Sequence, residues 1–441
     1  MGTFILGISL YVLPKFLGRF LTRFSLVWTV WALWTAGAAW RWWSGVERIG
    51  WRIGLPGSAV LELAAFALAQ YLLWVDHGGD TAGKPKKAFP GDLASWLGIA
   101  GFASFGMALL INLWESFAVS LQGSQPMFPV TVDRIFLVIA LWGFAIPVAV
   151  GYSTRFVTVF VGLEKPIQAA ARWLALGAAL IVVSALAGRF LLGDVVALAE
   201  ALGAVWALRV FRPAPREAKR AGVYRGYPLF IRLAFAWLVI GAVLGVFADL
   251  APSVTGLGGA SRHALTVGFL ATLIFCVGPL ILPAFLSGRE LWRASWMGAS
   301  LWVLSVGCLL RVSTEAVVYS NGGFAWKILP LSGLLELTAV VLFVANLGLT
   351  LVQPLPAWFG DSGVSGTMPV YFYVASFPKT RRVLIEGGLK TLEYAQAIPR
   401  SLTLAEAAEA DSANLDHLLS ALRAFFARRQ PRRFGRPSVT T

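Results

Sequence analysis

The chain has 441 residues, of which 58% are apolar and 13% are charged, and its mean hydropathy is +0.72. This composition excludes a soluble globular protein and favours a polytopic membrane protein. The net charge of +15 lies mainly in connecting loops and the C-terminal tail, so it indicates membrane topology and argues against a nucleic-acid partner. The two cysteines, Cys276 and Cys308, lie in apolar segments, which excludes a disulfide framework and indicates packing residues.

Apolar runs long enough to cross a bilayer as helices recur as far as about residue 351. They predict an all-α fold of about eleven transmembrane helices, at 1–17, 24–43, 57–75, 93–119, 131–155, 166–187, 190–211, 228–250, 263–286, 292–312 and 327–351. The basic loop at 212–225 and the basic tail place the C-terminus in the cytoplasm. An odd number of spans then puts Met1 outside, so we expect a twelve-helix pattern whose first helix is missing.

A short motif recurs along the chain. The sequence LPKFLG at 13–18 closely matches LPAFLSG at 282–288. A degenerate third copy at 151–156 aligns Thr154 with the two prolines, at offsets of 140 and 129 residues. Because each copy comes at the predicted inner end of its helix, the copies have the same orientation in the membrane.

Three glutamates repeat in step with this motif. Glu62, Glu200 and Glu336 lie in similar apolar settings, 138 and 136 residues apart. The period predicts three parallel four-helix units, at about 1–75, 93–211 and 228–351, around an axis along the membrane normal. A carboxylate inside a span is costly, so all three should face the bundle interior or water. They either fix helix packing through hydrogen bonds or bind a proton, metal or ligand.

Further charged residues gather at the predicted outer ends of the spans. They are Asp133, Arg134, Arg262, His263, Arg311 and Glu315. The first two pairs correspond in the repeat, since each begins 21 residues before its alignment point. All six could converge on one polar site. Alternatively, Arg134 and Arg311 reach the membrane interface or pair at helix ends.

Histidine is scarce. Only His263 lies near a span in a site-like setting, whereas His77 is in a predicted inner loop and His417 is in the C-terminal region. A well-ligated haem or copper centre ordinarily needs more imidazoles. The chain also contains no Walker A motif, nucleophile elbow, HExxH motif or Gly-rich dinucleotide turn. Catalytic turnover is therefore not indicated.

The composition becomes mixed after the last span. We expect a linker at 352–377, a small helical cytoplasmic domain at 378–427 and a basic disordered tail at 428–441. Thr403 and Glu406 have the spacing of a capping box that opens a helix. A second amphipathic helix is expected between Asn414 and Phe426. With so few residues the domain has a thin core, so it would dock on the membrane domain or a partner.

The sequence RHALTVG at 262–268, followed by a span and later by Arg311, resembles the last third of the NnrS family of membrane proteins. The threefold arrangement and the twelve-helix pattern over about residues 1–351 are similar to that family too. The resemblance implies a bacterial inner-membrane protein of the response to nitric oxide and nitrosative stress that contains haem and copper. It makes His263 the first candidate ligand. The N-terminal helix, where family members carry additional histidines, is missing from the pattern here.

The C-terminal region resembles a different module, the small helical domain at the start of iron-sulfur cluster repair di-iron proteins. The matching parts are VLIEGG at 383–388, the helix start at 403–408 and NLDHLL at 414–419. That domain often has a cysteine near its glycines, and this chain has none there, so thiol chemistry is not implied. Both resemblances point to nitrosative stress.

The leading hypothesis is an NnrS-like inner-membrane protein that holds haem or copper at an outward-facing site. Its candidate residues are His263, Arg262, Arg311, Glu62, Glu200 and Glu336, with Asp133 and Arg134 as further polar candidates. One alternative is a transporter for a small solute or metal ion that uses the intramembrane carboxylates. Another is a non-catalytic scaffold that contacts respiratory or denitrification proteins through its C-terminal domain.

Overall fold

The computed structural model describes most of the chain. The described residues are 2–16, 20–21, 23, 25–75, 77–78, 92–219, 222–285, 291–321, 323–352, 364–368, 370–377, 380–394 and 402–427. The loop with Lys84 and the basic tail at 428–441, about which the sequence makes predictions, lie outside these residues.

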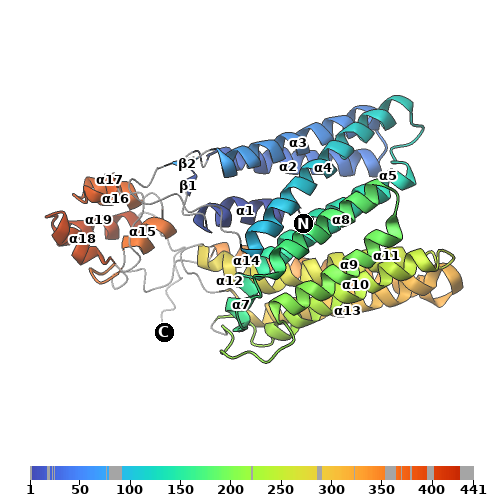
Figure 1. Ribbon diagram of the computed structural model, residues 1–441. Helices are drawn as coiled ribbons and strands as arrows, with labels where there is room; N and C mark the ends of the chain where they lie inside the picture. Colours follow the sequence, from blue (N-terminus) through green and yellow to red (C-terminus); the bar gives the residue numbers. More distant parts are fainter. Residues whose placement is uncertain are drawn as a thin grey trace, which may run out of the picture.

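Long helices packed side by side form the larger part of the molecule (Figure 1). They are α1 (Gly2–Phe16), α2 (Ser25–Val46), α3 (Trp51–Trp74), α4 (Leu93–Gln122), α5 (Val130–Val138), α6 (Ile146–Ser153), α7 (Phe156–Val161), α8 (Ala170–Leu186), α9 (Phe190–Leu208), α10 (Tyr227–Leu250), α11 (Leu257–His263), α12 (Thr272–Phe285), α13 (Ala294–Asn321) and α14 (Phe324–Val352). The only strand pairing among the described residues is a two-residue ladder between β1 (Phe20–Leu21) and β2 (His77–Gly78).

Eight helical stretches are long and apolar enough to cross a membrane. They are 51–74, 93–122, 130–161, 190–208, 227–250, 257–282, 294–319 and 324–352. Two further apolar helices, α1 and α8, are shorter. The chain is therefore an all-helical, multi-pass membrane protein.

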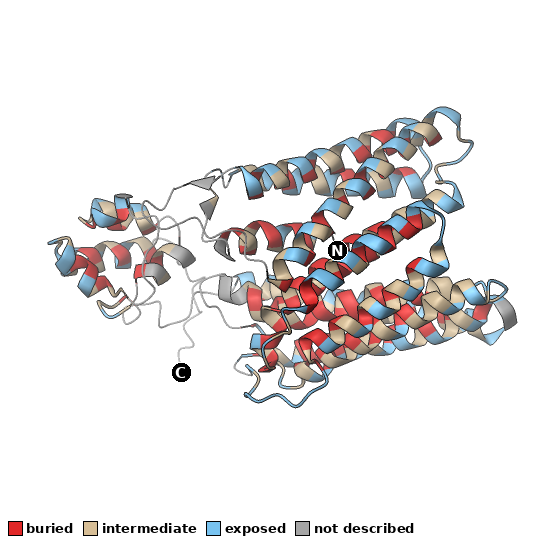
Figure 2. Ribbon diagram, in the orientation of Figure 1, coloured by how far each residue is buried: buried red, intermediate tan, exposed pale blue. Residues whose placement is uncertain are grey.

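The surface of the bundle agrees with a lipid environment. Large apolar side chains point outward along its length, and Trp114, Trp173 and Leu334 are 78%, 75% and 61% exposed. Figure 2 shows the buried residues on the helix faces that meet inside the bundle. So much exposed apolar surface is unfavourable in water but not in a bilayer.

Every span predicted from the sequence contains a helix, although the ends differ. The largest difference is at α13, which continues to Asn321 instead of ending at about residue 312. Arg311 and Glu315 appear to the sequence as a helix end because they are charged. In the structure each has a polar partner, so the helix continues through them.

Two of the helices are interrupted by a wider π-helical turn. The segment η1 (Ile139–Ala145) joins α5 to α6, and η2 (Ala264–Ala271) joins α11 to α12. Pro147 explains the first, because its ring is incompatible with the normal hydrogen bond to Gly143. In the second, the Thr272 hydroxyl donates to the carbonyl of Val267 at 3.1 Å and takes part in the local ladder.

The C-terminal region forms a small helical unit with its own core. Its helices are α15 (Val370–Ser376), α16 (Thr380–Glu386), α17 (Thr391–Tyr394), α18 (Leu404–Ala410) and α19 (Leu415–Ala427). The capping box of Thr403 and Glu406 is present, and α19 buries Leu418, Leu422 and Phe426, so both helix predictions are confirmed. The predicted linker at 352–377 extends too far, because Val364, Val370 and other residues of α15 are part of this core.

Candidate functional site

A close approach between α11 and α13 brings three helices together around His263. Gly256 and Gly259 on α11 face Glu315 on α13, and a Cβ atom at either glycine would collide with it. The absence of these side chains therefore lets the end of α11 lie against α13. This position places His263, the last residue of α11, beside the paired helices α13 and α14.

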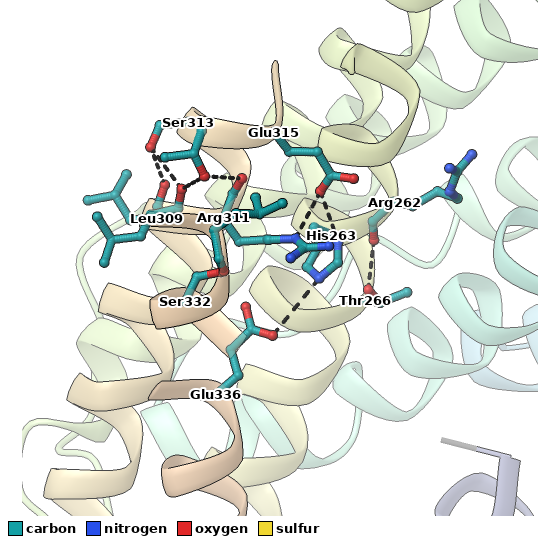
Figure 3. Close-up of polar contacts among 12 residues, drawn as sticks. Arg262, His263, Thr266, Leu309, Arg311, Ser313, Glu315, Ser332 and Glu336 are labelled. Atoms are coloured by element: carbon teal, nitrogen blue, oxygen red, sulfur yellow. Dashed lines mark hydrogen bonds and ion pairs between the residues drawn. The ribbon is translucent and has the colours of Figure 1, made fainter. Parts of the chain in front are cut away.

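His263 lies between two carboxylates from different helices (Figure 3). Its Nδ1 is 3.3 Å from Oε2 of Glu315 on α13, and its Nε2 is 3.9 Å from Oε2 of Glu336 on α14. Arg311 Nε donates to the same Glu315 oxygen at 3.2 Å, one helical turn away. We call these four residues the His263 cluster. They are partly to largely buried inside apolar helices, with side-chain exposures between 10% and 27%.

The charges of the His263 cluster balance only when the imidazole is protonated. Glu315 and Glu336 supply two negative charges as carboxylates, whereas Arg311 supplies one permanent positive charge. The second Glu336 oxygen, Oε1, is buried and has no hydrogen-bond partner among the described residues. A buried acceptor without a donor is costly. The cluster can therefore take up a proton or a hydrogen-bond donor at this oxygen.

Other predicted residues at this end of the bundle do not join the cluster. The Arg262 side chain is exposed and points away from His263 (Figure 3), and Asp133 is also exposed. Arg134 instead pairs with Asp194 and Asp249. The six charged residues thus do not form one polar site, because each lies on the face of a different helix.

Glu62 is held by a neutral partner. It is 93% buried on α3 and accepts a hydrogen bond of 3.0 Å from Nδ2 of Asn112, which is buried on α4. Arg41 on α2 lies nearby, but its Nη1 donates to the Ser116 hydroxyl at 3.5 Å. The Asn112 Oδ1 atom is buried without a partner in the described structure.

Glu200 has apolar surroundings. It lines a small cavity together with Trp142, Ile146, Leu174 and Leu238. Its carboxyl group makes no hydrogen bond or ion pair among the described residues. Glu62, Glu200 and Glu336 therefore have three different environments, and only Glu336 lies beside His263.

One feature is nevertheless common to the three glutamates. Each packs against a glycine of the preceding helix, where a Cβ atom would meet the glutamate side chain. The pairs are Gly37 with Glu62, Gly177 with Glu200, and Gly307 with Glu336. Small residues allow such close helix contacts in membranes.

The sequence contains a stronger signal for two of these hairpins than the repeated glutamate alone. LPGSAVLEL at 55–63 and LPLSGLLEL at 329–337 agree at six of nine positions. Arg41 and Arg311 each follow their contact glycine by four residues, which places glycine and arginine on one helix face. Asn112, Asp194 and Asp249 had a simpler signal, because each is a polar residue within an apolar run.

The described residues do not fit the expected haem or copper centre. They contain no group of three or more His, Cys, Asp and Glu side chains that could hold a metal ion. Both ring nitrogens of His263 face carboxylate oxygens, so neither is directed at a free coordination position. Cys276 and Cys308 are free and buried, as expected of packing residues.

The comparisons with known proteins assign no family to the chain. No family model matches it, and no curated protein matches it either. The functional interpretation therefore rests on the geometry of the polar clusters inside the helical bundle.

Proposed function

We propose that the chain is a membrane transporter that moves a small solute together with protons, and that the His263 cluster is its coupling site. The observation that carries this proposal is the position of His263, with its two nitrogens facing carboxylates on α13 and α14. Ionisable residues inside spans are costly and commonly mark proton or substrate pathways.

The chemistry of the cluster supports proton exchange. Imidazole gains and loses a proton near neutral pH, and it can receive a proton at one nitrogen and release it at the other. Because Glu315 and Glu336 lie on different helices, a small shift between α13 and α14 changes which carboxylate His263 contacts. Such a shift would couple proton release to a change of conformation.

The proposed architecture is eleven spans in three related units, with the C-terminus in the cytoplasm of a bacterial inner membrane. The three glycine-glutamate contacts and the two LPxSxxLEL sequences support the relation between units. The two π-helical turns, in η1 and η2, add a second correspondence. Transporters built from such repeats bind substrate at the repeat interface.

Reconstituted protein tests the proposal directly. Full-length protein is placed in liposomes that contain a pH-sensitive dye, and nitrite, formate and copper(II) are added in turn outside. We expect at least one solute to change the internal pH with the wild type, and His263→Asn and Glu336→Gln to abolish that change. His417→Asn, in the C-terminal unit, is the matched control and should behave as wild type. Equal signals from His263→Asn and the wild type would refute the coupling role.

A second candidate function is an NnrS-like role in tolerance of nitric oxide. It is favoured by one observation, that His263 and Arg311, which carry the sequence resemblance, contact the same Glu315 carboxylate. A strain lacking the gene should be sensitive to a nitric oxide donor and be rescued by the wild type but not by His263→Asn. The optical spectrum and metal content of the purified protein test the haem and copper expectation. Full rescue by His263→Asn would contradict this role for the cluster.

A further inference from the structure

A second charged cluster lies on different helices from the His263 cluster. Arg134 on α5 forms an ion pair with Asp249 on α10, and its Nη2 is 3.5 Å from Oδ2 of Asp194 on α9. The two aspartate side chains are only 11% and 16% exposed. Three helices therefore each contribute one charged residue to a largely buried group.

Arg134 is fixed in this position by an aromatic ring. Its guanidinium carbon lies 4.0 Å from the centre of the Phe190 ring, and Phe190 is one helical turn before Asp194 on α9. A cation over an aromatic face is stabilised electrostatically, more so when water is excluded. The guanidinium is thus held against α9 and α10.

The two aspartates also contact each other. Their carboxyl groups lie within hydrogen-bonding contact. An ionised carboxylate only accepts hydrogen bonds, so such a contact requires one of the two groups to carry a proton. Two carboxylates at this separation do not both ionise readily, as in the paired aspartates of acid proteases.

From this geometry we propose that Asp194 and Asp249 share one proton and form a second proton-binding site. The charge balance agrees, since Arg134 offsets one carboxylate and the shared proton neutralises the other. The Asp249 Oδ2 atom is buried without a hydrogen-bond partner among the described residues. Protonation of the pair lowers the cost of burying this oxygen.

No other described charge offsets the second carboxylate. Asp133 on α5, Arg189 before α9 and Arg262 on α11 are exposed, and none of them forms an ion pair with either aspartate. Ser261 on α11 faces the same region across Gly245, but its hydroxyl donates to the carbonyl of Gly241. Arg134 is therefore the sole described counter-ion of the acid pair.

The comparison with His263 gives the site a further meaning. Arg134 and His263 precede the two π-helical turns, at corresponding positions, and both contact carboxylates. Histidine can itself release a proton, whereas arginine stays protonated in proteins. In the second cluster the exchangeable proton must therefore lie on the acids. This inference rests on the contacts of the second cluster and not on transport activity.

Infrared spectroscopy of the full-length protein in detergent tests the inference. The wild type at neutral pH should show a carbonyl band of protonated carboxylic acid that shifts in D₂O. Asp194→Asn and Asp249→Asn should each remove the same component, because the remaining aspartate then pairs with Arg134 as a carboxylate. Asp133→Asn, an exposed neighbour, is the matched control and should leave the band unchanged.

A titration of the wild type provides a measurement that does not depend on whether the variants fold. Raising the pH should remove the same component as the variants and release a proton. A spectrum that loses nothing in either folded variant would overturn the proposal. It would also be overturned if no protonated component titrated in the wild type. Both outcomes are independent of solute movement in liposomes, so this proposal can fail while the transport proposal stands.

Discussion

Glu62, Glu200 and Glu336 share a glycine contact but differ in what their carboxyl groups meet. Asn112 donates to Glu62, apolar side chains surround Glu200, and His263 lies beside Glu336. Their common position is a matter of helix packing, whereas their chemistry depends on residues from neighbouring helices. Among the three, Glu336 alone has a described partner that exchanges protons near neutral pH.

The hydrogen bond between Asn112 and Glu62 tests the packing role at the scale of single residues. Asn112→Leu should lower the free energy of unfolding by about 1–3 kcal/mol, because Glu62 is left buried without its donor. The double variant Asn112→Leu with Glu62→Leu should cost less than the sum of the two single variants. Thermal unfolding in detergent measures all three. Additive effects would show that the two side chains do not stabilise each other.

Two adjacent glycines provide a matched pair for the geometry of the His263 cluster. A Cβ atom at Gly259 would collide with the Glu315 carboxylate, whereas one at Gly258 meets only Arg262, at 3.8 Å. Gly259→Ala should therefore destabilise the protein by roughly 1–3 kcal/mol through overpacking, and Gly258→Ala should not. Melting temperatures in detergent compare the two. If both variants melted at the same temperature, the close approach of α11 to α13 would be unsupported.

At the scale of helices, hydropathy identifies the spans because the requirement is local. Each helix must present about 20 apolar residues to the bilayer, so every predicted interval contains one. The polar clusters do not follow from this rule, because their members come from different helices. Asp194 and Asp249 are 55 residues apart in the sequence, and only the packing of α9 against α10 brings them together. Sequence patterns therefore predict which residues are unusual but not which of them meet.

The start of α18 is a helix end that the sequence predicts in detail. The Glu406 carboxylate accepts a hydrogen bond from the backbone N–H of Thr403, and this bond lowers the pKa of Glu406 below its ordinary value. Its stabilising contribution is therefore complete above the pKa of the unfolded chain and is lost as the pH falls through the lower, folded value. Amide signals of α18 followed by NMR should broaden or shift over this acidic range. Glu406→Gln should remove most of that pH dependence, and an unchanged profile would refute the assignment.

At the scale of the whole molecule, the membrane bundle and the C-terminal unit have separate hydrophobic cores. The first core extends through the long helices, and the second contains residues between Val364 and Phe426. Figure 1 shows the C-terminal unit beyond one end of the bundle. This separation explains why composition alone divides the chain near residue 352. It does not fix the exact boundary, because α15 is itself apolar.

The two cysteines allow the stability of the bundle to be measured on its own. Cys276 and Cys308 are both fully buried in the first core, and they are the only cysteines of the chain. A thiol-reactive fluorophore therefore reports unfolding of the bundle and not of the C-terminal unit. Removal of residues 364–441 should leave the labelling midpoint unchanged, since the two cores share no residue. Leu301→Ala, which empties part of the first core, should lower the midpoint by the equivalent of about 2–5 kcal/mol. If the truncation lowered the midpoint as much as Leu301→Ala, the C-terminal unit would have to stabilise the bundle by direct contact.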